Sequence, residues 1–590
     1  MANLRIILII IIGVVSFNAS QSLTEPDKPV KPGIKTFCNP INLPYNFQTP
    51  DITRREAADP VIVLYHNKYW LFASKQIGYW WSDDLLNWNQ VKPTGLPLEV
   101  YAPSVAVVDG KLYYSAGNNG TFTTDDPAVG KWVNVNPYKR GMADPDVFQD
   151  TDGRVYLYDG CSDRTPVRVT ELDRKTFLPL TDRMDQFFAN TDKHGWEVAG
   201  DDNRGRKEND LSEKSIVPWV EGSWMNKING KYYWQYSAPG TQFKTYADGV
   251  YVSDKPTGPF VYQSYSPFSF KPTGFIAGAG HSATFVDKQG KYWHISTGSI
   301  SVRHSFERRL VLFPTGILKD GQLVTNTYLG DYPQLAPGTA KDHLLGNSAQ
   351  WMLLSYNKPA KASSTLPDIN KQAFGVKNAF DEDIRTWWSA ATGNKGEWLQ
   401  VDLKKNCRIN AVQINFADQG AQQSGPLVND GYYYAVQASA DGKNWQVIID
   451  HRNDGRDAPH DYIQLPKPVM ARYVRVVNVH SPANGMFSIY DLRVFGSALG
   501  TLPPLVKTFT VKRDPTDGRC AHLGWKTNPN TDFYIVRYGI APDRLFGNYQ
   551  VYNTTSLDIN ALNIGVNYYF TVDAVNGTGI TKGNVVLESE

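Results

Sequence analysis

The sequence predicts an all-β protein whose largest part is a five-bladed β-propeller. Composition is the first indication, because aromatic residues make up 13% of the chain and 48 glycines and 36 prolines interrupt it. That balance favours short strands and turns over long helices. The second indication is an internal repeat that occurs five times. With 590 residues, the chain is also long enough for two to four domains.

Each repeat contains a basic residue that follows Gly or Asn and precedes an aromatic strand. The copies begin at Asn67, Gly110, Gly153, Gly230 and Gly290. Gly and Asn accept the positive φ of a two-residue hairpin turn, so each copy predicts a turn followed by a strand. Repeats of this length bury their faces against their neighbours, and five copies therefore predict five blades.

Ionisable residues stand near the start of the strand that precedes most of these turns. The segments are Ala58-Asp59-Pro60-Val61, Ala102-Pro103-Ser104-Val105, Ala143-Asp144-Pro145-Asp146, Val220-Glu221-Gly222-Ser223 and Gly280-His281-Ser282-Ala283. The innermost strand of every blade lines the channel of a propeller. We therefore expect Asp59, Asp144, Glu221 and His281 to meet in one axial pocket.

Three carboxylates in one pocket suit the hydrolysis of a glycosidic bond. One carboxylic acid protonates the leaving oxygen, and one carboxylate activates water or attacks directly. A third carboxylate raises the pKa of the acid and keeps it protonated near neutral pH. The alternative is a purely structural role, in which Asp-Pro opens a turn and Glu-Gly caps a blade. The similar position of the three carboxylates in the repeat argues against this alternative.

From about Cys38 to Gly330 the sequence resembles glycoside hydrolase family 43. The matching motifs are Ala58-Asp59-Pro60, Asp144-Pro145 before the turn from Phe148 to Gly153, and Glu221-Gly222. The resemblance implies that Asp59 is the general base, Glu221 the general acid and Asp144 the residue that tunes the pKa of Glu221. It also implies inversion at the anomeric carbon.

Other residues are candidates for substrate or metal binding. The resemblance places a channel arginine at Arg308, with Arg309 as the competing assignment. Trp80 and Trp81 could stack on a sugar ring, although their surroundings look like blade packing. His281 could hold an axial calcium or water, or be a packed histidine. No cofactor is required, and a structural calcium stays open.

A second β pattern from Asn347 to Gly496 resembles a discoidin, or factor 5/8 type C, domain. The matching segments are Ala379-Phe380-Asp381, Thr386 to Ala390, Glu397 to Leu403 and Arg472 to Arg475. It could bind carbohydrate or act as a spacer. A last unit from Leu505 resembles a fibronectin type III sandwich. The expected ranges are a propeller over 36–340, a discoidin-like domain over 345–497 and a fibronectin type III-like domain over 503–590.

The first 22 residues predict an export signal, because an apolar run from Ile6 to Phe17 follows Arg5. The run is too short for a transmembrane segment, so we expect a periplasmic or extracellular protein. A net charge of +2 argues against a nucleic-acid partner. The cysteines Cys38, Cys161, Cys407 and Cys520 are too scattered for a disulfide framework and predict lone thiols.

These observations together predict an exo-acting, inverting glycosidase that acts on plant polysaccharides or oligosaccharides. The expected product is a terminal pentose, with α-L-arabinofuranose first. The alternatives are a β-xylosidase or β-galactosidase of the same fold and a catalytically silent sugar-binding propeller. The sequence does not predict the oligomeric state.

Overall fold

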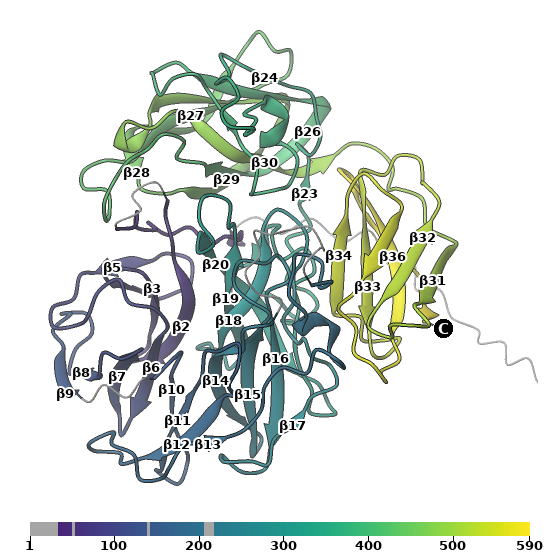
Figure 1. Cartoon of the computed structure of the whole chain (residues 1–590). Helices are drawn as coiled ribbons and strands as arrows, with labels where there is room; N and C mark the ends of the chain where they lie inside the picture. The colour runs from purple at the N-terminus through teal and green to yellow at the C-terminus, as the bar shows by residue number, and fades with distance from the viewer. Residues whose placement is uncertain (1–33, 50–53, 138–141, 206–216, 590) are drawn as a thin grey trace, which may run out of the picture.

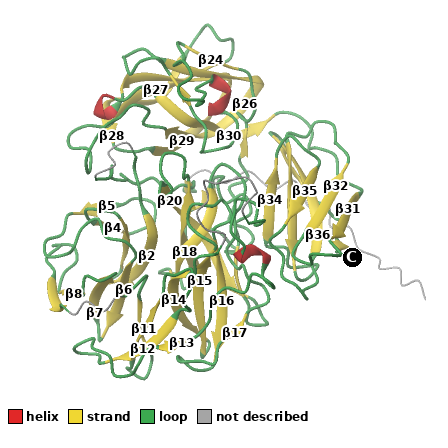
Figure 2. Ribbon diagram, in the orientation of Figure 1, coloured by secondary structure: helices red, strands yellow, loops and turns green. Residues whose placement is uncertain are grey.

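The computed structural model describes residues 34–49, 54–137, 142–205 and 217–589. The predicted export signal lies outside these residues. The prediction of an all-β protein is confirmed, because the described part of the chain holds strands, no α-helix and three short 3₁₀ turns (Figure 2). The 3₁₀ turns are η1 (Gly195–Glu197), η2 (Val376–Ala379) and η3 (Pro482–Asn484). None of the described helices is long and apolar enough to cross a membrane.

Five four-stranded antiparallel sheets form the blades of a propeller (Figure 1). The first holds β2 (Ala58–Tyr65), β3 (Lys68–Ser74), β4 (Tyr79–Ser82) and β5 (Asn89–Val91); the second β6 (Pro103–Val108), β7 (Lys111–Ala116), β8 (Thr121–Thr124) and β9 (Val133–Asn136); the third β10 (Asp146–Gln149), β11 (Val155–Asp159), β12 (Arg168–Leu172) and β13 (Met184–Asp185); the fourth β14 (Glu221–Ile228), β15 (Lys231–Ala238), β16 (Ala247–Ser253) and β17 (Val261–Tyr262); the fifth β18 (Ala277–Val286), β19 (Tyr292–Ser299), β20 (Arg308–Ile317) and β21 (Leu323–Thr325). The first strands of successive blades contact one another, and β18 contacts β2 to close the ring.

The predicted two-residue turns occur in three blades only. In the first, second and fourth blades the turn residues both have positive φ, as at Asn229 and Gly230. The third and fifth blades have five-residue connections instead, in which Gly153 and Gly290 donate to the carbonyls of Asp150 and Asp287. The prediction of a two-residue turn is therefore wrong for these two blades.

A backbone kink with positive φ stands at the start of the inner strand in every blade. The kinked residues are Asp59 (φ 50°), Ala102 (φ 50°), Asp144 (φ 47°), Gly222 (φ 66°) and His281 (φ 43°). Glu221 therefore precedes the kink by one residue, so our prediction that all three carboxylates share one register is wrong. Three of the kinks lie within a β-bulge, directly after the paired residues Ala58, Glu221 and Gly280.

Hydroxyl groups on second strands join neighbouring blades at these kinks. The backbone N–H of Ala102 donates to Ser74 Oγ at 2.6 Å, that of His281 to Ser237 Oγ at 2.7 Å and that of Asp59 to Thr297 Oγ1 at 2.9 Å. Each bond satisfies a backbone donor that has no partner in the strand ladder of its own blade. The kinks thus fix where the inner strands present their side chains.

The sheets that follow the propeller are a middle domain and a C-terminal sandwich. The middle domain is one eight-stranded sheet of β23 (Met352–Leu353), β30 (Ser488–Ala498), β26 (Trp398–Phe416), β29 (His460–His480), β27 (Tyr432–Ser439) and β28 (Gln446–Arg456), with β24 (Ala360–Ala362) on β26 and β25 (Trp388–Ser389) on β30. Trp387 and Trp388 are buried in hydrophobic clusters, so they are core residues of this domain.

The C-terminal sandwich has a three-stranded and a five-stranded sheet. The first holds β31 (Phe509–Arg513), β32 (Ala521–Trp525) and β35 (Ser556–Ile559); the second holds β34 (Gly547–Val551), β33 (Phe533–Gly539), β36 (Tyr569–Asn576), β37 (Gly579–Thr581) and β38 (Leu587–Glu588). This arrangement fits a small sandwich, and its likeness to fibronectin type III stays a prediction.

Both additional domains pack closely on the propeller. One hydrophobic cluster joins Trp196 and Trp234 of the propeller to Trp525 and Phe570 of the sandwich. A strand pair of β1 (Thr36–Phe37) and β22 (Gln334–Leu335) lies beside the middle domain, where Thr36 donates to Gln464. The three parts therefore share hydrophobic cores.

Candidate active site

Asp59 lies in the channel with only 4% of its surface exposed. Its carboxylate accepts from Ser74 Oγ at 2.5 Å and from Arg308 Nη1 at 3.2 Å. Burial alone would raise the pKa of Asp59, but Arg308, His281 and Ser74 together hold it below its ordinary value. Asp59 is therefore an anion at neutral pH.

Asp144 and Glu221 form a second acidic group, from the third and fourth blades. Their carboxylate oxygens and the thiol of Cys161 lie within 4.8 Å of one another. Burial raises the pKa of Asp144 to about 7, with Glu221 and Asp59 adding to the shift and His281 opposing it. Asp144 therefore carries a proton up to about neutral pH, beside Glu221.

Two neutral donors face Glu221. Tyr246 donates to Oε1 at 2.5 Å and the thiol of Cys161 to Oε2 at 3.3 Å. Burial and the nearby carboxylates raise the pKa of both groups, so each keeps its proton. Because both oxygens of Glu221 accept hydrogen bonds, the proton of the pair rests on Asp144 in this arrangement.

His281 connects the two acidic groups. Its Nδ1 lies 3.3 Å from Asp59 Oδ1 and 3.6 Å from Asp144 Oδ2. Burial opposes its charged form, but Asp59, Asp144 and Glu221 outweigh this and raise the pKa of His281. The structure thus brings all four predicted residues into one cluster.

Arg308, rather than Arg309, enters the channel. Its guanidinium donates to Glu56 Oε1 at 2.7 Å and to Thr241 Oγ1 at 3.2 Å, besides Asp59. Arg309 points away and donates to His460 of the middle domain at 2.8 Å. Successive residues of β20 face opposite sides of the sheet, so only one of the two candidates, Arg308, can be the channel arginine.

The two candidate stacking residues do not lie in this cluster. Trp80 is fully buried in the blade core, so it has no ring face for a sugar, and this prediction is wrong. Trp81 lies on β4, the third strand of its blade, opposite Trp70 of β3. Lys68 Nζ lies 3.4 Å from the centroid of the Trp81 ring. An outer position and a covering ammonium group give Trp81 no route to the channel.

Tyr101 is the aromatic residue beside the site. It precedes the kink at Ala102, as Glu221 precedes the kink at Gly222, and it is 42% exposed. Arg308 lies 5.8 Å from its ring centroid and Phe306 packs on it edge to face. An exposed aromatic ring next to the carboxylates is a suitable surface for a sugar.

The polar segment from Asn190 to Gly205 contacts both additional domains. Arg519 and Asn560 of the sandwich donate to the carbonyls of Thr191 and Asp202, and Arg385 of the middle domain pairs with Asp201 at 2.7 Å. Asp150 to Gly153 forms part of the five-residue turn between β10 and β11.

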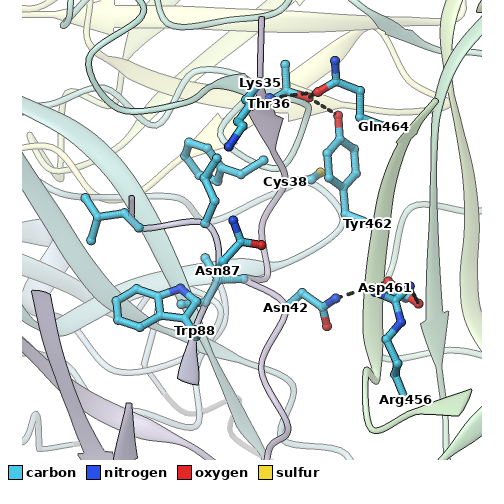
Figure 3. Close-up of a pocket in the computed structure, with 14 residues that line it drawn as sticks. Lys35, Thr36, Cys38, Asn42, Asn87, Trp88, Arg456, Asp461, Tyr462 and Gln464 are labelled. Carbon is cyan, nitrogen blue, oxygen red and sulfur yellow. Dashed lines mark hydrogen bonds and ion pairs between the residues drawn. The ribbon is translucent and has the colours of Figure 1, made fainter. Parts of the chain in front are cut away.

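A cleft of about 540 Å³ lies elsewhere, between the first blade and the middle domain (Figure 3). Trp88 and Asn87 line one side, and Asp461 and Arg456 the other. None of the clustered carboxylates lines it. The cleft marks the contact between two domains rather than the acidic cluster.

Comparison with known proteins assigns the two larger parts of the chain. Residues 48–323 match the family model "Glycosyl hydrolases family 43", and residues 359–492 match the "F5/8 type C domain". Residues 48–323 belong to glycosyl hydrolase family 43. The family 43 domain is therefore a glycoside hydrolase, and the middle domain is an F5/8 type C domain.

Relatives of the family 43 domain are named for several different activities. A β-D-galactofuranosidase of Aspergillus niger is 26% identical over 282 residues, covering 40% of this chain and 72% of the relative. A β-xylosidase of Xylanibacter ruminicola is 31% identical over 176 residues, covering 26% and 53%. A xylosidase/arabinosidase of Bacteroides ovatus is 25% identical over 259 residues, covering 35% and 76%.

Solved structures include a thermostable family-43 glycoside hydrolase at 21% identity, which covers 52% of this chain and all of that chain with a TM-score of 0.41. An exo-1,5-α-L-arabinanase from a bovine ruminal metagenomic library is 20% identical, covering 47% and 98% with a TM-score of 0.34.

The donor atoms of the family 43 site do not match a calcium shell. The group of described residues with suitably close donors is Asp144, Cys161 and Glu221. Calcium prefers several oxygen ligands, and a thiol is a poor ligand for it. His281 directs Nδ1 at two carboxylates. The axial calcium or water at His281 stays a prediction.

Proposed function

We propose that the protein is an exo-acting, inverting glycosidase that removes a terminal pentose, first of all α-L-arabinofuranose, from plant polysaccharide side chains. One observation carries the proposal: Asp59 and Asp144 meet around His281, with Glu221 beside Asp144, in one channel cluster. Arg308, His281 and Ser74 hold the pKa of Asp59 below its ordinary value, whereas burial raises the pKa of Asp144 to about 7. Inverting hydrolysis needs a base and an acid in these two states.

Asp59 is our candidate for the general base. Arg308 and His281 keep its carboxylate charged, and Ser74 fixes one oxygen by a hydrogen bond. Its other oxygen can accept a proton from a water that attacks the anomeric carbon. Asp59 becomes a neutral carboxylic acid in that step, and Arg308 and His281 favour its return to the carboxylate afterwards.

Glu221 is our candidate for the general acid, and Asp144 stores and tunes the proton. As a glycosidic oxygen approaches, the proton held by the pair moves to the leaving oxygen through Glu221. Tyr246 and Cys161 then stabilise the resulting carboxylate, because each already donates to it. Burial raises the pKa of Asp144 to about 7, which keeps a proton beside Glu221 near neutral pH.

The substrate class is supported by the relatives and by the aromatic edge of the site. The relatives are named as a galactofuranosidase, a xylosidase and a xylosidase/arabinosidase. We propose that the terminal sugar stacks on Tyr101, beside Arg308. β-Xyloside hydrolysis is the second candidate, since a β-xylosidase is among the relatives. The predicted export signal would bring the enzyme to polysaccharides outside the cytoplasm.

A panel of nitrophenyl glycosides tests this proposal. We expect release from α-L-arabinofuranoside above β-D-xyloside and β-D-galactofuranoside, and release of monosaccharide only from arabinan or arabinoxylan. Proton NMR of the first product would show inverted anomeric configuration. Product with retained configuration, or no turnover on any glycan, would contradict the proposal.

A further inference from the structure

We propose that the F5/8 type C domain is a positioning element of the active site, which holds Arg308 and Glu56 in place through the residues next to them. The inference rests on the proposed function of the channel. It gives the middle domain a role in turnover that does not depend on sugar binding. Three separate contacts between the domains carry the argument.

The first contact uses the alternation of side chains along β20. Arg308 faces Asp59 and Glu56, whereas Arg309 faces the middle domain and donates through Nε to His460 Nε2 at 2.8 Å. His460 accepts there because its Nδ1–H donates to Asn415 at 2.8 Å. Burial and the two nearby arginines lower the pKa of His460, which keeps the imidazole neutral and able to accept.

The second contact holds the segment that carries Glu56. The preceding residue, Arg55, is 1% exposed and donates to Asp418 at 2.9 Å and to Asp457 at 2.7 Å in the middle domain. Arg309 also donates to the carbonyl of Arg55 at 2.8 Å. Glu56, one residue further, is the partner of Arg308. The contacts of Arg55 and Arg309 with the middle domain therefore both hold the backbone next to Glu56.

The third contact holds the residue before Arg308. Glu307 accepts from Tyr490 of the middle domain at 3.0 Å and from Arg303 at 3.1 Å. Arg303 also donates to Tyr490 at 2.8 Å and to the carbonyl of Ala417. Both neighbours of Arg308 are thus fixed to the second domain, one on each side along the chain.

Further contacts extend the same interface beyond the channel. Arg385 donates to the carbonyl of Gln242 at 3.4 Å and Lys244 pairs with Asp383 at 3.4 Å, in the loop that carries Thr241 and Tyr246. On another side, Asn42 donates to Asp461 at 3.2 Å (Figure 3). The middle domain therefore contacts the segments that carry or flank Asp59, Arg308 and Tyr246, the residue that donates to Glu221.

Positioning of this kind has measurable value in catalysis. A displacement of about 1 Å at a reacting group can cost roughly 100-fold in rate. Arg308 is long and flexible, so its geometry at Asp59 depends on the backbone that carries it. Loss of the contacts should lower kcat more than it raises KM. It should also move the acid limb of the pH profile upward, because Asp59 loses part of the positive charge that keeps it ionised.

Variants of the full chain at the far end of these contacts test the proposal. Tyr490→Phe removes one hydroxyl at the Glu307 contact, His460→Leu removes the acceptor of Arg309, and His460→Gln keeps an acceptor. Arg472→Gln is the matched control, because Arg472 pairs with Asp402 within the middle domain at 2.7 Å. Thermal unfolding and circular dichroism would verify that each variant is folded.

We expect kcat to fall about 10- to 100-fold in His460→Leu and less in Tyr490→Phe, with KM nearly unchanged and the acid limb moved to higher pH. His460→Gln should restore most of kcat, and Arg472→Gln should match the parent. If the parent is active and both folded variants keep kcat and the pH profile within twofold, the proposal is overturned. Should His460→Leu not fold, Tyr490→Phe decides alone. A parent without activity on any glycoside would instead reject the proposed function.

Discussion

At the scale of single residues, the site separates charge by giving each carboxylate different neighbours. Asp59 faces Arg308 and a hydroxyl, and it is ionised. Asp144 lies close to the carboxylate of Glu221 and the thiol of Cys161, and its burial raises its pKa. Environment, rather than residue type, assigns the base and the proton-holding pair.

These charge states predict the pH dependence of turnover. The base must be deprotonated, and the pKa of Asp59 lies below its ordinary value, so activity should be lost only at strongly acidic pH. The pair must hold its proton, and the pKa of Asp144 is about 7, so kcat/KM should fall as the pH rises through about 7. A kcat/KM profile measured on one arabinofuranoside would verify both limbs. Full activity at pH 9 would contradict the assignment of the proton.

Substitution of Tyr101 tests the sugar-stacking surface. Tyr101→Ala should raise KM about tenfold, because loss of one aromatic contact costs roughly 1 kcal/mol or more, while Tyr101→Phe should keep KM. Trp81→Phe is the control and should leave KM unchanged, since Trp81 lies on an outer strand under Lys68. Steady-state kinetics on the best substrate would measure this. A larger KM effect at Trp81 than at Tyr101 would place the sugar elsewhere.

The sequence predicted the residues of the cluster that stand in the repeat. Asp59, Asp144, Glu221 and His281 were found because their motifs recur shortly before the turn of their own repeat. Cys161 and Tyr246 were missed because they lie outside that motif. Trp80 was misplaced because blade packing and sugar stacking use the same aromatic residues. Tyr101 had a detectable signal, since it stands beside the kink of its own blade.

At the scale of elements, the kinked start of the inner strands is the feature that brings side chains of different blades into one site. In four of the blades the residue at or before the kink joins one cluster, which holds Asp59, Asp144, Glu221 and His281. Gly222 occupies the kink in the fourth blade, where an added Cβ would lie 2.7 Å from Ser237 Oγ and 3.1 Å from the Cα of His281. Glycine at this position lets Glu221 and His281 approach.

Alanine at Gly222 should therefore reduce both stability and turnover. We expect Gly222→Ala to lower the free energy of unfolding by about 1–3 kcal/mol and to lower kcat, because positive φ and crowding act together. Gly230→Ala is the control, since Gly230 also has positive φ but an added Cβ meets nothing within 4 Å. It should cost about 1 kcal/mol and leave kcat unchanged. Urea unfolding and kinetics would compare them, and equal effects would refute the crowding argument.

The repeat could be counted from sequence, but its turns could not all be assigned. In the third and fifth blades an Asp stands three residues before the glycine, and its backbone carbonyl accepts the glycine N–H. Asp287 also accepts from the backbone of Gln289 and Lys291 through its side chain. These local bonds stabilise a longer turn and outweigh the two-residue pattern. The Asp-x-x-Gly spacing was the available signal.

At the scale of the whole molecule, the three parts share buried polar groups as well as hydrophobic clusters. Arg493 of the middle domain pairs with Glu382 at 2.8 Å and donates to the carbonyl of Asp331 in the segment that follows the fifth blade. Lys271 pairs with Asp331 at 3.2 Å, again without exposure to solvent. Removal of one partner would leave a buried charge without compensation.

This packing predicts cooperative unfolding. Scanning calorimetry of the full chain should give one main transition, because the interfaces are buried like domain interiors. Arg493→Met should lower the free energy of unfolding by about 3–5 kcal/mol and keep a single transition. Well-separated transitions in the parent protein would contradict this description of the interfaces.

The order of the domains could be predicted from sequence, but their mutual packing could not. Motifs such as Glu397 to Leu403 identify a sheet by its own core. Contacts such as Arg309 with His460 join residues that are 151 positions apart and belong to no repeat or motif. Because each of these residues alone is typical of a solvated surface, only the folded chain shows that they pair.

The most direct test of the central claim compares leaving groups in Glu221→Gln and Asp59→Asn. The acid variant should lose about 100- to 10,000-fold on an arabinofuranoside with an unactivated leaving group and far less on a nitrophenyl arabinofuranoside, because a good leaving group needs no proton. The base variant should lose activity on both. If Glu221→Gln keeps near-parental rates on the unactivated substrate, or if Asp59→Asn retains turnover, the carboxylates of this channel do not perform the hydrolysis.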